Sequence, residues 1–327
     1  MPLLLTTEWF LSHCGERFEQ IVAGHALRPI TLPADGGRLA AADAEAVEVA
    51  FFHGDFRSDP GLTRRFFGTT LHAPNLRWMH LPNSGVDDPV FGRLLANGVR
   101  LTSSPGAAAE PIAHSAVTGM LALARGFPHW IDAQRRHAWE EHRADRTPRD
   151  LRGQTLVLLG VGAIGTRVAH LARAFGLHVI GVRRSPRNES DPVDEIHPPA
   201  KLNDLLPRAD WLVITCPLTD ETRGLIDAAA LARLRPTACI INVARGQIID
   251  ENALIAALRA GAIAGAYLDV FEEEPLPASS PLWDLPNVLI SPHDSGASTG
   301  NAVRASELFL ANLERWLRGD ELVNEIL

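Results

Sequence analysis

The sequence predicts an α/β protein with two doubly wound domains, each built on a parallel sheet. Its 327 residues correspond to about two domains of ordinary size. Short apolar runs alternate with helical patterns along the chain, as they do in βαβ units. In the second half the runs LVLLG, LHVIGV, WLVITC, ACIINV, AGAYLDV and NVLISP follow one another, and each is mostly apolar on both faces. Strands with that pattern are typical of a sheet covered by helices on both sides.

Further strands and helices complete the predicted order of elements. Shorter strands are expected at residues 3–5, 28–32, 47–52, 76–81 and 99–102. Helices are expected at residues 8–23, 108–125 and 302–318, and the last of them could return to the first domain. We therefore expect one domain to comprise residues 1–106 plus 299–327 and the other to comprise residues 107–298.

The composition limits the class of protein. A formal net charge of −8 does not suit a protein that coats nucleic acid. Cys14, Cys216 and Cys239 lie far apart, which disfavours a disulfide scaffold or a zinc ribbon and favours a reducing compartment. The start of the chain lacks the basic region of a secretory signal, and the apolar stretches are too short to span a bilayer. We expect a cytoplasmic protein with no metal site, no nucleic-acid partner and no membrane association.

A glycine-rich turn follows the strand at residues 155–159. The sequence GVGAIG stands between that buried strand and a helical pattern, the context in which such a turn binds the pyrophosphate of a dinucleotide. The first glycine permits the tight turn, the second lets the backbone approach the phosphates, and the third lets the helix pack close to the strand. The alternative is an ordinary strand-to-helix turn without a ligand. The cofactor-binding residues expected here are Gly160, Gly162, Ala163, Ile164 and Gly165.

The residues after the next strand bear on which dinucleotide binds. A site selective for NAD carries Asp or Glu about 20 residues beyond the glycines, where it accepts a hydrogen bond from the ribose 2′-hydroxyl. Here the strand runs instead into Arg183, Arg184 and Ser185. Guanidinium groups and a hydroxyl can pair with a 2′-phosphate, so these residues favour NADP(H), with NAD(H) as the alternative cofactor. A solvated basic loop without a ligand is the other interpretation.

Three polar residues follow strands in the second half of the chain: Arg245, Glu274 and His293. Ligands of open α/β sheets collect outside the carboxyl ends of the strands, so we expect all three at one crevice. The His could donate a proton to a developing alkoxide, the carboxylate would favour the imidazolium, and the Arg could bind a 2-oxo acid. Each residue taken alone also has a structural explanation, because ion pairs and polar strand ends are common.

The order of motifs resembles that of a known family. The chain carries GVGAIG at 160–165, TCPLT at 215–219, NVARGQIID at 242–250, AYLDVFEEEPLP at 266–277 and SPHDSGAS at 291–298, with LPNSGVD at 81–87 and TSSPGAAA at 102–109 in the first domain. These motifs are similar to the signatures of the D-isomer-specific 2-hydroxyacid dehydrogenases. The resemblance implies a flavodoxin-like substrate domain and a Rossmann-like dinucleotide domain with a cleft between them.

The resemblance also implies roles for individual residues. Arg245 would bind the substrate, His293 would donate and accept the proton, and Glu274, directly before Pro-Leu-Pro, would support the His. Ser84 and Gly85 would offer backbone N–H groups to the substrate carboxylate. Further cofactor contacts would come from Cys216, Pro217, Val243, Asp269 and His293.

Together these roles describe an oxidoreductase that transfers a hydride between NADP(H) and a small 2-oxo acid or D-2-hydroxy acid, such as glyoxylate or hydroxypyruvate. Arg183 stands where NAD-using relatives carry Asp, which supports NADP(H). The resemblance implies a homodimer, formed through a long arm that the charged segment 134–152 could supply. Two alternatives are a nucleotide-sensing, corepressor-like interaction protein of the same fold and a phosphite-type dehydrogenase with the same three residues.

Overall fold

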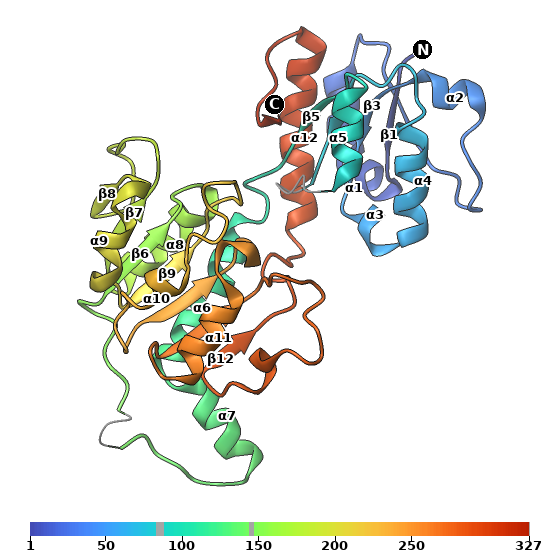
Figure 1. Ribbon diagram of the computed structural model, residues 1–327. Coiled ribbons are helices and arrows are strands. Elements are labelled where there is room, and N and C mark those ends of the chain that lie inside the picture. The colour runs from blue at the N-terminus through green and yellow to red at the C-terminus, as the bar shows by residue number, and fades with distance from the viewer. Residues whose placement is uncertain (83–87, 144–146, 327) are drawn as a thin grey trace. The chain divides into compact units, whose positions relative to one another are not determined.

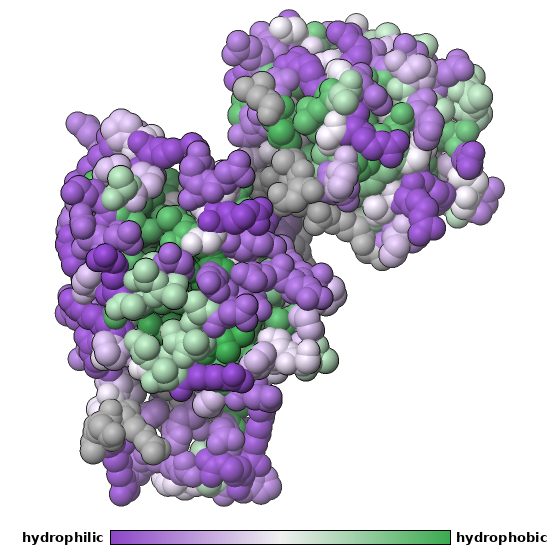
Figure 2. Space-filling model, viewed as in Figure 1, coloured by the Kyte–Doolittle hydropathy of each residue, from purple (hydrophilic) through white to green (hydrophobic). Residues whose placement is uncertain are grey.

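In the computed structural model the chain divides into two compact units, each built around its own sheet (Figure 1). Unit 1 comprises Met1–Ala108 and Ser298–Leu327, and unit 2 comprises Ala109–Ala297. The structure describes residues 1–82, 88–143 and 147–326. Hydrophilic side chains cover much of the surface seen in Figure 2, with apolar side chains between them. Two α/β units with mainly parallel sheets confirm the predicted fold class.

Unit 1 holds a six-stranded sheet in the order β13-β5-β4-β3-β1-β2. Its strands are β1 (Leu3–Thr6), β2 (Arg28–Thr31), β3 (Val47–Phe51), β4 (Trp78–His80), β5 (Arg100–Thr102) and β13 (Glu325–Ile326). The first five strands have the order of the flavodoxin-like doubly wound fold. The edge strand β13 pairs antiparallel with β5, and the side chains of Arg100 and Glu325 join the two strands at 2.6 and 2.7 Å.

Helices cover both faces of this sheet, because successive side chains of its strands point to opposite faces and those on both faces are apolar. Leu4 packs with Phe10 of α1 and Phe309 of α12 on one face, whereas Leu5 packs with Phe66 of α4 and residues of α5 on the other. The helix α1 begins after Thr7, whose hydroxyl accepts a hydrogen bond from the backbone N–H of Phe10. The helices of unit 1 are α1 (Glu8–Val22), α2 (Ala41–Ala46), α3 (Asp55–Ser58), α4 (Pro60–Thr70), α5 (Pro89–Ala96) and α12 (Asn301–Arg318).

Unit 2 holds a seven-stranded parallel sheet in the order β12-β11-β10-β9-β6-β7-β8. Its strands are β6 (Thr155–Leu159), β7 (His178–Val182), β8 (Glu195–His197), β9 (Trp211–Ile214), β10 (Cys239–Asn242), β11 (Gly265–Leu268) and β12 (Val288–Ile290). This is the Rossmann order with one further strand at the β12 edge, and the order reverses between β6 and β9. Ligands of such sheets bind at that reversal, beside the carboxyl ends of the strands.

The edge strand β8 was not among the predicted strands. It is three residues long, and Ile196 is its only apolar side chain. Polar contacts hold it in place: Glu195 accepts hydrogen bonds from Arg208 and lies within 2.8 Å of the rings of His178 and His197. The hydrogen bonds from Arg208 and the two imidazoles hold the pKa of the Glu195 carboxyl far below its usual range.

The inner strands of unit 2 are buried on both faces, as the apolar runs predicted, whereas the edge strands β8 and β12 are only partly buried. In β6, Leu156 and Leu158 face the layer that contains α6 and α8, whereas Val157 and Leu159 face the layer that contains α9, α10 and α11. The helices of unit 2 are α6 (Ala109–Ala124), α7 (Phe127–Arg135), α8 (Ala163–Ala174), α9 (Leu202–Leu205), α10 (Ala228–Leu231) and α11 (Glu251–Arg259), with short 3-10 turns η2 (Pro199–Lys201), η3 (Leu206–Arg208), η4 (Gly246–Ile248) and η5 (Pro281–Asp284). Among the described residues, none of the helices combines the length and the apolarity that a membrane span requires.

Candidate active site

The carboxyl ends of β10, β11 and β12 are joined to one another by backbone hydrogen bonds. The carbonyl of Asn242, the last residue of β10, accepts from the N–H of Asp269, which follows β11, at 3.0 Å. The carbonyl of Asp269 in turn accepts from the N–H of His293, which follows β12, at 2.8 Å. These bonds bring the segments that carry Arg245, Glu274 and His293 to one edge of the sheet.

His293 and Glu274 form a direct pair. Nδ1 of His293 lies 2.7 Å from Oε2 of Glu274, and Oε1 of Glu274 accepts a hydrogen bond from the N–H of Phe271 at 3.0 Å. The backbone of His293 has a φ of +53°, a conformation that residues other than Gly rarely adopt. Such a residue is held in place by its surroundings, and the surroundings here set the direction of the imidazole.

Asp269 holds the backbone around His293 in place, a structural role that the sequence analysis did not predict. Its carboxylate is buried and accepts hydrogen bonds from the Ser291 hydroxyl at 2.6 Å and from the N–H groups of Asp294 and Ser295 at 2.9 and 3.0 Å. The hydroxyl of Ser295 also donates to it. The segment on both sides of His293 is therefore tied to one carboxylate. The contact between Asp269 and a nicotinamide remains a prediction.

Glu274 differs from the adjacent Glu272 and Glu273 in what its carboxylate contacts. Glu272 binds the start of α11 instead, where its Oε1 accepts from the N–H of Glu251 at 3.2 Å and its own N–H donates to Oε2 of Glu251 at 3.1 Å. Glu273 is exposed. Of these adjacent acids, Glu274 is the one that the structure places against the imidazole.

Arg245 follows β10 in a loop that packs closely on the segment before Glu274. A Cβ at Gly246 would lie 1.9 Å from the carbonyl carbon of Phe271, so only Gly permits this approach. The side chain of Asn242 fixes the turn, since its amide donates to the carbonyl of Arg245 at 3.0 Å and its Oδ1 accepts from the N–H of Ala244 at 3.1 Å. The guanidinium of Arg245 donates to the carbonyl of Ala244 at 2.7 Å.

The glycine-rich turn lies where the strand order reverses, and its glycines differ in their surroundings. A Cβ at Gly160 would lie 2.6 Å from the backbone nitrogen of Cys216, and one at Gly165 would lie 2.1 Å from the carbonyl oxygen of Gly160. The chain's own packing therefore requires these two. A Cβ at Gly162 would meet no atom within 4 Å, so the chain's own packing does not require a glycine there, and the open space fits the approach of a ligand. Gly162 is also the N-cap of α8, which Ala163 and Ile164 begin, and this arrangement fits a pyrophosphate.

The segment after β9 packs against the same turn. The hydroxyl of Thr215 donates to the carbonyl of Gly160 at 2.7 Å. Thr215 directly follows β9, the strand that pairs with β6, and this position at a strand end could have indicated the contact. Burial raises the pKa of the Cys216 thiol to about 11, so the thiol stays protonated and packs as an apolar group. Val243, like Cys216, is buried. Contacts of Cys216, Pro217 and Val243 with a cofactor remain predictions.

The basic loop after β7 is folded on itself. Arg183 makes a two-bond ion pair with Asp191, with Nη1–Oδ1 and Nη2–Oδ2 distances of 2.8 and 2.5 Å. Arg184 and Ser185 are exposed. The predicted phosphate ligands thus lie together in one loop, but Arg183 already holds a carboxylate.

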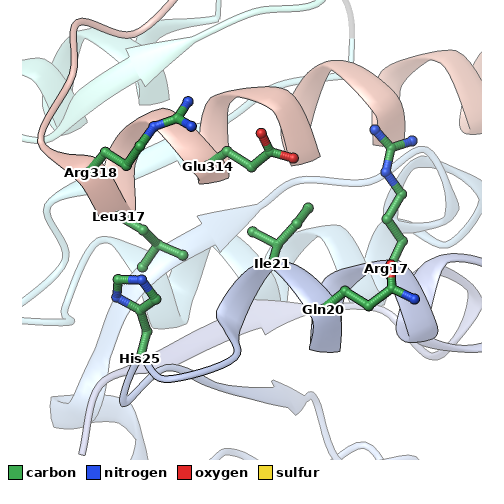
Figure 3. Close-up of a pocket in the computed structure, with 7 residues that line it drawn as sticks. All are labelled: Arg17, Gln20, Ile21, His25, Glu314, Leu317 and Arg318. Carbon is green, nitrogen blue, oxygen red and sulfur yellow. The ribbon is translucent and has the colours of Figure 1, made fainter.

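The predicted substrate residues of the first domain are Ser84 and Gly85, which lie outside the described residues. A separate hollow of about 380 Å³ lies in unit 1 between α12 and α1 with the loop that follows it (Figure 3). It is lined by Arg17, Gln20, Ile21, His25, Glu314, Leu317 and Arg318. None of the predicted site residues that the structure describes borders this hollow.

Comparison with known proteins gives a consistent result. Residues 117–295 match the model of the D-isomer specific 2-hydroxyacid dehydrogenase, NAD binding domain. The chain belongs to the D-isomer-specific 2-hydroxyacid dehydrogenase family. It is 38% identical over 255 residues to a glyoxylate reductase of Aeropyrum pernix, covering 76% of this chain and 75% of that one. It is 36% identical over 252 residues to glyoxylate/hydroxypyruvate reductase B of Pectobacterium carotovorum, covering 76% and 78% of the two chains.

A solved structure extends the likeness to the whole chain. The D-isomer specific 2-hydroxyacid dehydrogenase of Xanthobacter autotrophicus Py2, in complex with NADPH and MES, aligns with a TM-score of 0.75 and 31% identity over 100% of this chain and 98% of its own. The family resemblance seen in the motifs is thus confirmed. The protein is an oxidoreductase of this family, transferring a hydride between a nicotinamide cofactor and a 2-oxo or 2-hydroxy acid.

Proposed function

We propose that the protein is an NADPH-dependent reductase of small 2-oxo acids, with glyoxylate or hydroxypyruvate as substrate and a D-2-hydroxy acid as the product wherever the product is chiral. The observation that carries this proposal is the 2.7 Å contact between His293 Nδ1 and Glu274 Oε2. A carboxylate in that position holds the ring through Nδ1, so Nε2 is left to present a proton. The names of the relatives support the two substrates, since one is called glyoxylate reductase and the other glyoxylate/hydroxypyruvate reductase B.

The cofactor and the residues of the chain have separate roles in the proposed reaction. Bound NADPH supplies the hydride that reduces the substrate carbonyl carbon. His293 donates its Nε2 proton to the carbonyl oxygen, while Glu274 holds the ring through Nδ1 and stabilises its positive charge. Arg245 binds the substrate carboxylate, a task for which the planar guanidinium fork is suited. Ser84 and Gly85 are proposed to hold the same carboxylate through backbone N–H groups.

The preference for NADP(H) rests on the basic loop. Arg183 directly follows β7, and no acidic residue stands at that strand end to accept from a ribose 2′-hydroxyl. The compared Xanthobacter structure contains NADPH, which is in keeping with this preference. Charge-assisted hydrogen bonds to a 2′-phosphate correspond to a preference of about 10- to 100-fold over NADH.

The proposed assembly is a homodimer, formed by α7 and the segment that follows it. Large apolar side chains are exposed there: Trp139 is 93% exposed, Phe127 47% and Ile131 40%. Exposed apolar groups gathered on one segment are typical of an interface. Sedimentation of the protein and of Trp139→Glu tests this assembly. A dimer that dissociates in the variant is expected, and a monomeric protein would contradict it.

The proposed activity is tested by mixing the purified protein with glyoxylate, hydroxypyruvate or pyruvate and either NADPH or NADH, and by following nicotinamide absorbance. Oxidation of phosphite with NADP⁺ is run as a separate arm. We expect turnover of glyoxylate or hydroxypyruvate with kcat/KM higher for NADPH. Nucleotide binding without turnover of any 2-oxo acid would overturn the proposal, as would turnover of phosphite alone.

A further inference from the structure

We propose that Asp191 weakens the recognition of a 2′-phosphate by occupying the guanidinium of Arg183, and that this residue thereby sets how strongly the enzyme discriminates between NADP(H) and NAD(H). The inference rests on the proposed use of NADP(H) and adds a specificity-determining residue to it. Asp191 lies eight residues beyond Arg183 in the chain, in a stretch for which the motifs assign no role.

The bonds of Arg183 are almost all internal to the loop. Besides its two bonds to Asp191, its Nε donates to the carbonyl of Ser185 at 3.1 Å and its Nη2 donates to the carbonyl of Pro186 at 2.6 Å. These bonds use four of the five N–H donors of a guanidinium. A phosphate binding to Nη1 and Nη2 of this guanidinium would meet the Asp191 carboxylate, which already occupies them.

Asp191 is well fixed in this position. Its Oδ2 also accepts from the N–H of Asn188 at 2.6 Å. The side chains of Arg183 and Asp191 are only 16% and 10% exposed, so water and salt screen the pair less than an ordinary surface ion pair. The hydrogen bonds from Arg183 keep the pKa of the Asp191 carboxyl below its usual range, so the carboxylate stays charged at neutral pH.

The pair borders a hollow that could admit a ligand group. The hollow measures about 600 Å³ and is lined by Arg183, Ser185, Arg187, Glu189 and Asp191 among others. Arg187 is also tied to the loop, through bonds of 3.1 Å to the carbonyls of Asp194 and Val193. An anion that enters this hollow therefore meets guanidinium groups already bonded to the loop and a fixed negative charge.

The expected consequence follows from the charges. An NAD-selective site carries an acidic residue at the end of this strand. Here Arg183 stands at that end, and Asp191 places a carboxylate on its guanidinium. A phosphate dianion must displace this carboxylate or bind beside it, and either course reduces the gain from the Arg. Replacing Asp191 by Asn removes the charge and keeps the shape, so it frees the guanidinium fork for the phosphate.

The test compares two nucleotide fragments by calorimetry, using the protein, the variant Asp191→Asn and the matched control Asp204→Asn. The fragments are 2′,5′-ADP, which carries the 2′-phosphate, and 5′-AMP, which lacks it. We expect Asp191→Asn to raise the affinity ratio of 2′,5′-ADP to 5′-AMP by about 5- to 20-fold, because one ion pair no longer competes. The control removes an exposed carboxylate on α9 that pairs with Lys201 and does not line the hollow, so its ratio should change by less than about twofold. An unchanged or lowered ratio in Asp191→Asn overturns the proposal.

Two further comparisons keep the outcomes separate. Introducing Asp191→Asn into an Arg183→Gln background should leave the ratio unchanged, since the competing partner is gone; the same shift there would show that Asp191 acts otherwise, for instance through the shape of the loop. The ratio in the unmodified protein tests the NADP(H) preference by itself. A preference for 2′,5′-ADP without a shift in Asp191→Asn retains the proposed cofactor and rejects the role of Asp191. If the unmodified protein does not prefer 2′,5′-ADP but the ratio rises in Asp191→Asn, the role of Asp191 is retained and the proposed cofactor preference is rejected.

Discussion

Nδ1 of His293 lies 2.7 Å from Oε2 of Glu274, and the other oxygen of that carboxylate accepts from the N–H of Phe271. Glu274 is thus fixed by the backbone of its own loop and faces the imidazole with one oxygen. This arrangement leaves Nε2 of His293 as the ring nitrogen that can act on a substrate.

Replacing Glu274 by Gln should lower kcat for reduction by about 10- to 100-fold with little change in NADPH affinity, because the carboxylate that orients the imidazole through Nδ1 is lost. Steady-state kinetics, with nucleotide binding measured separately, check both effects. Glu273→Gln is the matched control, and equal losses of kcat in the two variants would contradict the role of Glu274.

Replacing His293 by Ala should reduce kcat by about 10²- to 10⁴-fold, the usual contribution of a positioned acid or base. The dissociation constant of NADPH should change little, since the remaining turn is held by Asp269 through Ser291 and Ser295. Single-turnover kinetics and fluorescence titration measure the two quantities. Unaltered turnover would refute the proton-donor role.

Replacing Arg245 by Ala should raise KM for the 2-oxo acid and lower kcat, since the group that binds the substrate carboxylate is removed. A loss of about 10²-fold or more in kcat/KM corresponds to a charge-assisted, two-bond contact. Arg259→Ala, at the end of α11, provides an Arg control away from the site. If both variants lost activity equally, the effect would not be due to substrate binding.

His80 predicts an acid sensitivity in unit 1. Its ring is fully buried, with Nδ1 2.7 Å from the Thr102 hydroxyl and Nε2 2.8 Å from the Ser104 hydroxyl. The Thr102 oxygen accepts from Trp78, and the Ser104 hydroxyl donates to Leu81. These roles suit a neutral imidazole that accepts at Nδ1 and donates at Nε2.

Burial lowers the pKa of His80 to about 3, whereas an unfolded His titrates near 6.5. Below about pH 6.5 the unfolded chain binds the extra proton, so stability falls by about 1.4 kcal/mol per pH unit until about pH 3. Urea unfolding at about pH 7 and about pH 5 measures this loss. The variant His80→Gln should be less stable at neutral pH but lose less on acidification. Parallel curves for the two proteins would contradict the assignment.

Much of the fold could be predicted because apolar runs of the right length mark buried parallel strands. The strands β8 and β13 escaped this reasoning: each is two or three residues long and is held by ion pairs, Glu195 with Arg208 and Glu325 with Arg100. Neither an apolar run nor a turn signal marks such strands in the sequence. Their positions depend on partners that only folding brings together.

Spacing likewise located the segments of the candidate site but not all of their contacts. Strand ends and motifs pointed to Arg245, Glu274 and His293, because parallel strands bring their carboxyl ends to one edge. The pairing of Arg183 with Asp191 depends on how the loop between them folds back, which residue type alone does not specify. The hydrogen bonds of the Asp269 carboxylate are hidden for the same reason, since they reach residues beyond the next strand.

Transfer of deuterium tests the proposed reaction most directly. Hydroxypyruvate is incubated with the protein and NADPH labelled with deuterium at the reactive C4 position, and the product is analysed by mass spectrometry and chiral chromatography. Each face of C4 is labelled in a separate sample. We predict D-glycerate with deuterium on C2 from one of the two samples. L-glycerate, unlabelled product from both samples, or no product although NADPH is bound would contradict hydride transfer to a 2-oxo acid in this site.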